Sequence, residues 1–374
     1  MFAFGLEHEV AFLNSQGQFA DFTCTSFPQL QHIVEALPLY ATDYPQLRIG
    51  DAGIKKKRWY VEGFERFADS DQVIDCIPKG IEIRTTIHAT IQGVIAELSE
   101  SFVQLRNTAI HAGFMPVLIS FNPYRDQYQP QPPLNAYELY RRQISPEKQT
   151  AHIPMLTYGP DLNLSVAGLS TAQLIDIGQK LTYYSPFIIP FSFSSPFYRG
   201  ELWSGLSVRT FVRTGARPAA LVFVEKSESL IASSPSLTKM ARIPAEVGRI
   251  EFKAFDSCDD FSRYAALLAL LKGLILDETL PGRATTPDAA LHQTAAQYGF
   301  DDPMIADSAQ QVLQAATAAL SSDPDAALLL PLQDALDQRR TPAHALIEAY
   351  RQSGSIQAVL QQTYRQPEVQ VAVL

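Results

Sequence analysis

The chain has 374 residues, a formal net charge of −9 and 46% hydrophobic residues. This length suffices for one large domain or two ordinary ones, and the acidic balance argues against a nucleic-acid partner held by bulk electrostatics. Three widely spaced cysteines argue against a disulfide framework or a zinc cluster, and no secretory signal pattern opens the chain, so we expect a cytoplasmic protein.

The first predicted element is a strand at residues 4–13, FGLEHEVAFL, which carries two acids in apolar company. Side chains alternate between the two faces of a strand, so residues two apart share a face. Glu7 and Glu9 therefore point the same way. The opposite, apolar face carries Phe4, Leu6, His8, Val10 and Phe12. We interpret His8 as an ordinary core or surface histidine and not as part of a site.

The segment KKKR at 55–58 is interpreted as a solvated turn. A second strand, KGIEIRTT at 79–86, places Glu82 and Arg84 together on one face, opposite two isoleucines. A helix is predicted over 87–109 and a core strand within 111–121. The polar, proline-rich segment 122–149 is predicted to be a long loop, a kind of segment that is often functional.

The next predicted strand, DLNLSVAG at 161–168, places Asn163 and Ser165 on its polar face. A helix follows over 171–185. The segment LSVRTFVR at 206–213 is interpreted as a strand with Arg209, Phe211 and Arg213 on a common face.

A second long loop is predicted at 226–248. The strand GRIEFKAF then places Glu251 and Lys253 on one face and apolar residues on the other. From about residue 260 the chain is rich in alanine and leucine, with helices predicted over 261–279, 286–298, 304–320, 325–338 and 342–363. The apolar run 264–276 is too short to cross a bilayer and contains a lysine, so we predict a core helix and no membrane partner. The end of the chain, 364–374, is compatible with a frayed tail or a closing strand.

This pattern predicts an α+β protein with a helical C-terminal region. Each polar face taken alone is typical of a solvated antiparallel strand. If the strands share one sheet, however, one side of it gathers four acids beside four bases. The acids are Glu7, Glu9, Glu82 and Glu251, and the bases are Arg84, Arg209, Arg213 and Lys253.

Crowded carboxylates raise one another's pKa unless cations neutralise them. Carboxylate oxygen is the ligand that Mg²⁺ or Mn²⁺ prefers, usually together with substrate phosphates, and arginine recognises phosphate or carboxylate oxygens. The sequence therefore predicts a metal and nucleotide site. It contains neither a Walker loop nor a GxGxxG dinucleotide motif.

Four ordered blocks resemble the carboxylate–amine ligases, a family that includes one type of glutamate–cysteine ligase and shares the glutamine-synthetase-like catalytic fold. The blocks are GLEHE, IEIRTTIHATIQGVIAEL, SPFIIPFSFSSPFYRGELWSGLSVRTFVRTGARP and GRIEFKAFDS, which span roughly residues 5–257. The resemblance implies an antiparallel sheet with a concave active-site face and helices on the other face. It also implies a catalytic domain at 1–280 and a helical region, 281–374, packed on the same domain.

The implied activity is formation of an amide through an acyl phosphate at the expense of ATP, with glutamate and cysteine as the expected substrates in glutathione biosynthesis. By position, Glu7, Glu9, Glu82 and Glu251 would bind the metal ions, Mg²⁺ or alternatively Mn²⁺. The catalytic arginines would be Arg209 and Arg84. The nucleotide side of the site would include Arg213, Lys253, Asn163 and Ser165. Small-molecule substrates are the implied partners, and a homo-oligomer is compatible with the resemblance.

Two departures from the family pattern keep other functions open. LNLSV stands where the family often has a His-x-His strand, and Lys253 stands where it usually has arginine. Asparagine and serine are weaker metal ligands than histidine, and lysine lacks the bidentate fork of arginine. The alternatives are a catalytically weakened relative that binds nucleotide or amino acid, and a phosphoryl transferase acting on a guanidine-type acceptor.

Overall fold

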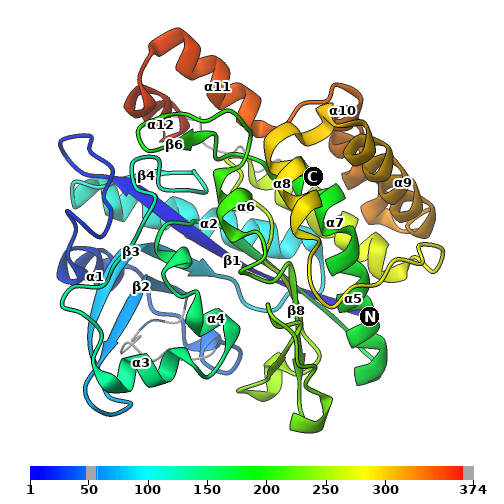
Figure 1. Ribbon diagram of the computed structural model, residues 1–374, viewed down its shortest axis with the longest axis horizontal. Helices are drawn as coiled ribbons and strands as arrows, with labels where there is room; N and C mark the ends of the chain where they lie inside the picture. The colour runs from blue at the N-terminus through cyan, green and yellow to red at the C-terminus, as the bar shows by residue number, and fades with distance from the viewer. Residues whose placement is uncertain (48–55, 57, 365–374) are drawn as a thin grey trace.

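A mostly antiparallel sheet runs through the centre of the molecule, which is known from a computed structural model that describes residues 1–47, 56 and 58–364 (Figure 1). The strand order is β2 (Trp59–Phe67), β3 (Val73–Arg84), β1 (Phe2–Leu13), β5 (Pro160–Val166), β10 (Ile250–Phe252), β8 (Ala220–Val224) and β9 (Thr238–Met240). A short strand, β4 (Met115–Val117), pairs with the end of β1, and β8 and β9 are parallel. Parts of the KKKR segment and of the chain end, residues 55, 57 and 365–374, lie outside the described residues.

Strand β1 lies between β3 and β5 and fixes the geometry of the polar face. Glu7 is paired with Arg84 on β3 and with Asp161 on β5, while Glu9 is paired with Glu82 on β3. On the other face every second residue of β1 is buried. His8 belongs to that buried face, and the Tyr264 hydroxyl lies 3.0 Å from its Nδ1 atom. His8 is thus a core histidine, one of the two positions expected for it, and the alternation of β1 is confirmed.

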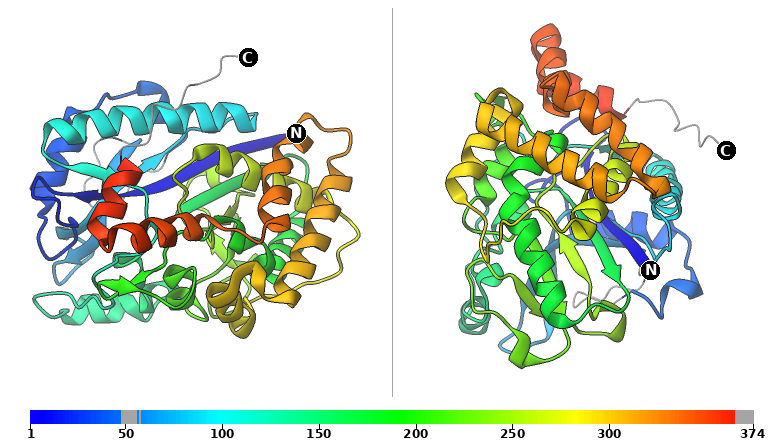
Figure 2. Two further views of the ribbon diagram at one scale, coloured as in Figure 1. Left: turned by 90° about the horizontal axis from the view of Figure 1, so that it is seen from above. Right: turned by 90° about the vertical axis from the view of Figure 1, so that its right-hand side faces the viewer.

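Four helices cover the apolar face of the sheet. They are α1 (Phe27–Ala36), α2 (Ile91–His111), α5 (Thr171–Ile188) and α7 (Phe261–Leu276). Helix α1 contacts β2 and β3, α2 lies beside β1 (Figure 2), and α5 contacts β8 and β10. Helix α7 is buried along nearly its whole length and contacts α2. The predicted α+β fold with helices on one face of a glutamine-synthetase-like sheet is confirmed.

The chain beyond residue 280 is helical in its described part. It forms α8 (Ala289–Tyr298), α9 (Pro303–Ala319), α10 (Leu330–Asp337), α11 (Pro342–Ser353) and α12 (Ile356–Tyr364). Helix α9 packs against α7 and α5, and α12 packs beside β4. The approach of α9 to α7 is close, because a Cβ atom on Gly273 would lie 2.7 Å from that of Ala316. None of the described helices combines the length and hydropathy needed to cross a bilayer.

The segment 206–213 is a helix, and its prediction as a strand was wrong. Helix α6 (Val208–Arg213) begins after Ser207, whose side chain accepts a hydrogen bond from the backbone N–H of Thr210. The β-branched residues of this segment favour a strand. The capping residue Ser207, however, is held in place by a residue that lies outside the segment. The Ser207 hydroxyl donates to the buried carboxylate of Asp256, and a cap held in this way determines where the helix starts.

The two predicted long loops contain short elements. Residues 122–149 include α3 (Ala136–Arg142) and α4 (Pro146–Gln149), and residues 226–248 include β9 and two short 3₁₀ turns. Each of the two helices begins with a side-chain cap, from Asn135 and Ser145 respectively. The helix predicted over 342–363 is divided in two by Gly354, which has a left-handed φ of 65°. In these places local capping and turn chemistry outweighed the average composition of the segment.

Candidate active site

The polar face of the sheet forms the floor of a cavity of about 550 Å³. Strands β1, β2, β3, β5 and β10 contribute the floor, and residues of α3, α4 and α6 contribute the walls. All ten residues predicted for the site line this cavity. They are Glu7, Glu9, Glu82, Arg84, Asn163, Ser165, Arg209, Arg213, Glu251 and Lys253.

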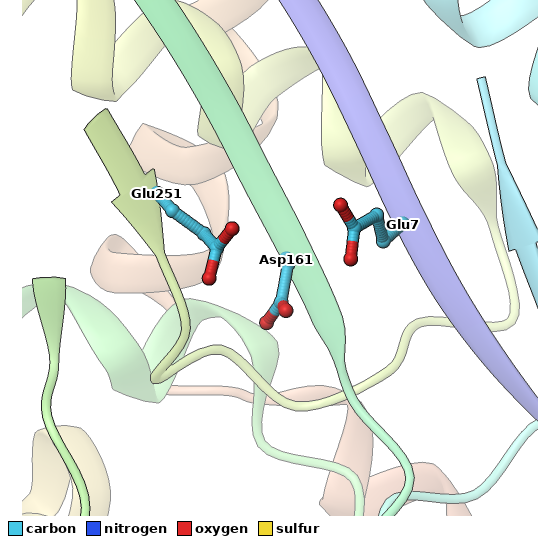
Figure 3. A group of neighbouring side chains, drawn as sticks. All are labelled: Glu7, Asp161 and Glu251. Atoms are coloured by element: carbon cyan, nitrogen blue, oxygen red, sulfur yellow. The ribbon is translucent and has the colours of Figure 1, made fainter. Parts of the chain in front are cut away.

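The acids form two separate groups, and the first triad consists of Glu7, Asp161 and Glu251. These residues lie on the neighbouring strands β1, β5 and β10, and Figure 3 shows the carboxylates of Glu7 and Glu251 directed from either side toward Asp161. One oxygen from each carboxylate lies within 4.8 Å of the others. Oxygen ligands at about 2.0–2.6 Å from a metal ion stand at such separations from one another, so the triad fits a hard divalent cation.

The second triad consists of Glu9, Glu62 and Glu82, again with one oxygen of each within 4.8 Å of the others. Glu9 and Glu82 face each other directly across β1 and β3, and Glu62 comes from β2. Like charges in directly opposed positions destabilise a sheet. The Oε1 atom of Glu82 is buried and has no hydrogen-bond partner among the described residues. A bound cation would supply that partner, so this triad also fits a divalent metal ion.

Three basic side chains neutralise part of this charge. Lys253 Nζ forms ion pairs with Asp161 and, at 2.6 Å, with Glu251. Arg249 lies 2.9 Å from Glu251 and 3.5 Å from Glu7. In the second triad, Lys79 is 2.6 Å from Glu9 and also donates to the backbone carbonyls of Pro154 and Thr157.

The pKa values of the acids follow this distribution of cations. Burial and the neighbouring glutamates raise the pKa of Glu62 to about 7, although Lys79 opposes the shift. Burial, together with Glu62, Glu7 and Glu9, holds the pKa of Glu82 well above its usual value. Burial likewise opposes ionisation of Glu251, but Lys253 and Arg249 outweigh it and lower its pKa to about 2. Asp161 of the first triad departs from this distribution, because burial raises its pKa to about 6 although Lys253 opposes the shift. The second triad is therefore the one with less positive charge beside it.

Helix α6 places two arginines on the same side of the cavity. Arg209 and Arg213 are four residues apart, so they share one helix face, while Phe211 is 43% exposed on the other. The predicted common face of the two arginines is confirmed, but Phe211 does not share it. Arg209 donates to the carbonyls of Ala254 and Lys253, and its buried Nε atom has no partner among the described residues.

Arg213 is buried and donates to the carbonyls of Pro218 and Lys253. Burial, and then the charges of Arg209 and Arg217, hold its pKa well below the usual arginine value. Arg213, whose charged form is disfavoured by burial and by two neighbouring arginines, would be stabilised by an anion. The wall formed by α6 therefore suits a phosphate or carboxylate group.

The remaining predicted residues lie along the floor. Arg84 is buried, and its guanidinium carbon is 4.4 Å from the centre of the Tyr60 ring. Asn163 is paired with Glu251 across β5 and β10, and its buried Oδ1 atom has no partner among the described residues. Ser165 follows two residues later on the same strand. Asn163 thus offers a neutral oxygen ligand beside the first triad.

Sequence reasoning missed Asp161, Glu62, Lys79 and Arg249. Alternation could have identified the two acids, because Asp161 is two residues from Asn163 and Glu62 lies in the alternating segment WYVEGFERF. Lys79 gave no such signal. Lys79 has no paired residue on β2, because Glu62 is paired with Gly80 and Gly63 with Pro78. This β-bulge interrupts the alternation of β3 and turns the lysine toward the acids.

Several solved ligases have a similar fold. The bifunctional glutathione synthetase from Pasteurella multocida matches with a TM-score of 0.61 and 12% identity, over 97% of this chain and 52% of that one. The glutamate–cysteine ligase from Francisella tularensis, in complex with AMP, matches with a TM-score of 0.59 and 11% identity, over 97% and 88% of the two chains. The ligase PafA, in complex with the prokaryotic ubiquitin-like protein Pup, matches with a TM-score of 0.56 and 11% identity, over 98% of this chain and 74% of that one.

These likenesses establish the fold. It is a carboxylate–amine ligase type of fold, as the sequence blocks predicted, and the chain spans about half the length of the bifunctional enzyme. No protein-family description matches the sequence, and neither does any curated protein.

Proposed function

We propose that this protein is an ATP- and divalent-metal-dependent ligase that joins a carboxylic acid to an amine. One observation carries the proposal: two carboxylate triads share strand β1 on the floor of a single cavity, and the arginines of α6 form its wall. Two groups of hard anionic ligands facing buried arginines suit a substrate with several phosphates. The fold shared with solved ligases supports the same conclusion.

The two triads are the residues that would hold the metal ions, which when bound neutralise phosphate charge. In the proposed reaction, an oxygen of the acid bonds to the γ-phosphorus of ATP while the bond to the ADP oxygen breaks. The amine nitrogen then bonds to the acyl carbon, phosphate leaves and the nitrogen gives up a proton. Arg209 and Arg213 would orient the acid and stabilise negative charge on the transferred phosphoryl group.

Glutamate and cysteine are the substrates we propose to test first. The sequence blocks resemble glutamate–cysteine ligases, and a protein of that name is among the structural neighbours. For these substrates the acid would be the γ-carboxylate of glutamate and the product γ-glutamylcysteine. A second anionic group on the acid would also suit the arginines of the α6 wall. Mg²⁺ is the proposed ion, and Mn²⁺ should substitute for it because both prefer carboxylate oxygen.

The test is phosphate release from Mg-ATP by the purified protein, with product masses measured for a panel of acids and amines. We expect release only when acid and amine are both present. Glu82→Gln should lower the rate by about 100-fold or more, because it weakens the ligand set of the second triad. The exposed residue Glu201 provides the matched control, and Glu201→Gln should leave the rate unchanged.

Other outcomes separate the alternatives. A phosphorylated acceptor in place of an amide would replace the ligase proposal with phosphoryl transfer. Metal-dependent ATP binding without turnover across the panel would favour a binding protein. One observation supports that second candidate: Asn163 and Ser165 stand where the family often has histidines.

A further inference from the structure

The two triads differ in how much protein charge opposes their acids. The first triad has two basic partners, Lys253 and Arg249, in direct contact with its three carboxylates. In the second triad the ion pair formed by the described residues is that of Lys79 with Glu9. Glu82 is about 95% buried, and its Oε1 atom is left without a partner in the described part of the chain. The second triad consequently has fewer basic side chains in contact with its acids.

Lys253 is positioned to act specifically on the first triad. Phe252 is paired with Leu162, so the next residue, Lys253, comes opposite Asp161 at the end of β10. Its backbone N–H donates to the carbonyl of Ala219, and its carbonyl accepts from Arg209 and Arg213. The backbone is therefore fixed, while the ammonium group at the end of four methylenes can rotate away.

We propose that Lys253 is a tethered counter-ion that a divalent metal ion must displace from the first triad, so that metal binds first at the second triad. A metal ion entering between Asp161 and Glu251 meets an ammonium group in contact with both carboxylates, and the two cations repel each other at short range. The Oδ1 atom of Asn163, buried without a described partner beside Glu251, is available to a metal ion once the ammonium group has moved.

The consequence is an ordered filling of the cavity. The second triad binds a metal ion without displacing a bridging lysine, whereas the first triad must break the two ion pairs of Lys253. Breaking these ion pairs costs binding free energy, so the first triad is the weaker one. The inference rests on the proposed metal-dependent function but concerns metal binding alone, without nucleotide or substrate.

The experiment is a titration with Mn²⁺ in the absence of ATP, with free Mn²⁺ measured by electron paramagnetic resonance. We expect one tight ion and one weaker ion in the wild-type protein. Glu82→Gln should abolish the tight ion, and Glu251→Gln should leave it in place. Lys253→Met should tighten the weaker ion by about tenfold or more, because its binding no longer requires displacement of a charge.

Two control variants separate this effect from a general change in charge. Lys226→Met removes an exposed lysine that does not line the cavity, and should change the weaker affinity by less than about threefold. Lys253→Arg keeps the positive charge and should preserve the order of binding. Circular dichroism of each variant checks that it is folded.

The proposal is overturned if Glu251→Gln, and not Glu82→Gln, removes the tight ion, or if Lys253→Met leaves both affinities unchanged. Should Lys253→Met not fold, the two glutamate variants still determine which triad binds first. No step of the titration involves ATP or an amine. The order of metal binding can therefore be established even if the protein is not a ligase, and the ligase activity can be established even if the order of metal binding is different.

Discussion

Gly159 shows how a single residue without a side chain permits the geometry of the arginine wall. It precedes β5, and a Cβ atom there would lie 2.1 Å from the guanidinium of Arg209. Its backbone N–H also donates to Glu9 at 2.9 Å. The glycine therefore brings the α6 wall and the second triad close together.

Gly159→Ala should displace Arg209 and weaken binding of an anionic substrate by about tenfold or more, with little loss of stability, because a long side chain can move aside. Isothermal titration with ATP in the presence of Mg²⁺ measures this effect. Arg209→Ala removes the clash. In the double variant, Gly159→Ala should therefore add no further loss, and additive losses would contradict this account.

At the scale of single elements, α6 depends on a buried hydrogen-bond group. Asp256 accepts from the backbone N–H of Ser194 at 3.0 Å and from the hydroxyls of Ser195 and Ser207, and Ser207 caps α6. Arg209 lies 3.7 Å from the same carboxylate. This arrangement links the start of the helix to the chain that follows β10.

Ser207→Ala should lower the free energy of unfolding by roughly 1–2 kcal/mol, because it removes a helix cap and leaves buried polar groups without a partner. Urea denaturation followed by circular dichroism measures the change. The exposed Ser227 offers a matched control, and Ser227→Ala should lie within about 0.5 kcal/mol of the wild type. Equal stability of the two variants would show that the cap contributes nothing.

The elements that could be predicted from the sequence are those whose pattern is regular over their full length. Alternation identified β1 and the acid-bearing strands, and apolar periodicity identified α2, α5 and α7. Alternation failed at residues 206–213, because polar residues four apart lie on one face of a helix as well as on one face of a strand. It also failed at Lys79, where a bulge interrupts the alternation. Both errors depend on contacts distant in sequence, such as Asp256 with Ser207.

For the whole molecule, the acids make stability without metal depend on pH. The pKa of Glu62 is raised from 4.5 to about 7 and that of Asp161 from 3.8 to about 6. Their stabilising contributions are complete below the unfolded pKa values and are lost as the pH rises through the folded values. Glu251, with its pKa lowered to about 2, contributes above its unfolded value and loses that contribution in stronger acid.

In the presence of EDTA, these two acids should lower the free energy of unfolding as the pH rises from about 4 to about 7. Glu62→Gln should flatten this decline. Mg²⁺ should oppose it, because a cation binds the ionised acids of the native state. Urea denaturation at a series of pH values measures all three effects. If the free energy of unfolding in EDTA increased over this range in the wild type but not in the variant, the assignment of these pKa values would be refuted.

The helices after residue 280 complete the core around α7. Lys272 on α7 forms ion pairs with Asp323 and Asp325 at 2.7 and 2.6 Å, and the close contact at Gly273 joins α7 to α9. We propose that 281–374 is a helical region packed on the catalytic domain, 1–280, and not an independent unit. Without the helices that cover it, the apolar surface of α7 would be exposed to water.

A chain ending at residue 280 should aggregate or lose its cooperative unfolding transition, because the buried face of α7 would meet water. A chain ending at residue 364, which keeps every described contact, is the control and should unfold cooperatively. Size-exclusion chromatography and thermal denaturation distinguish the two. A soluble, cooperatively folded 1–280 chain would show that the C-terminal helices form a separate unit.

Strand β1 carries one acid of each triad, and this has a consequence for how the protein folds. Because side chains alternate, a slip of β1 by a single residue would turn Glu7 and Glu9 into the core and bring His8 to the cavity. Both triads would be lost together, and the ladders with β3 and β5 would both have to shift. A metal ion that binds these acids consequently stabilises only correctly aligned chains. During refolding it should select against misaligned chains, acting as a check on the folding of the strand that holds it.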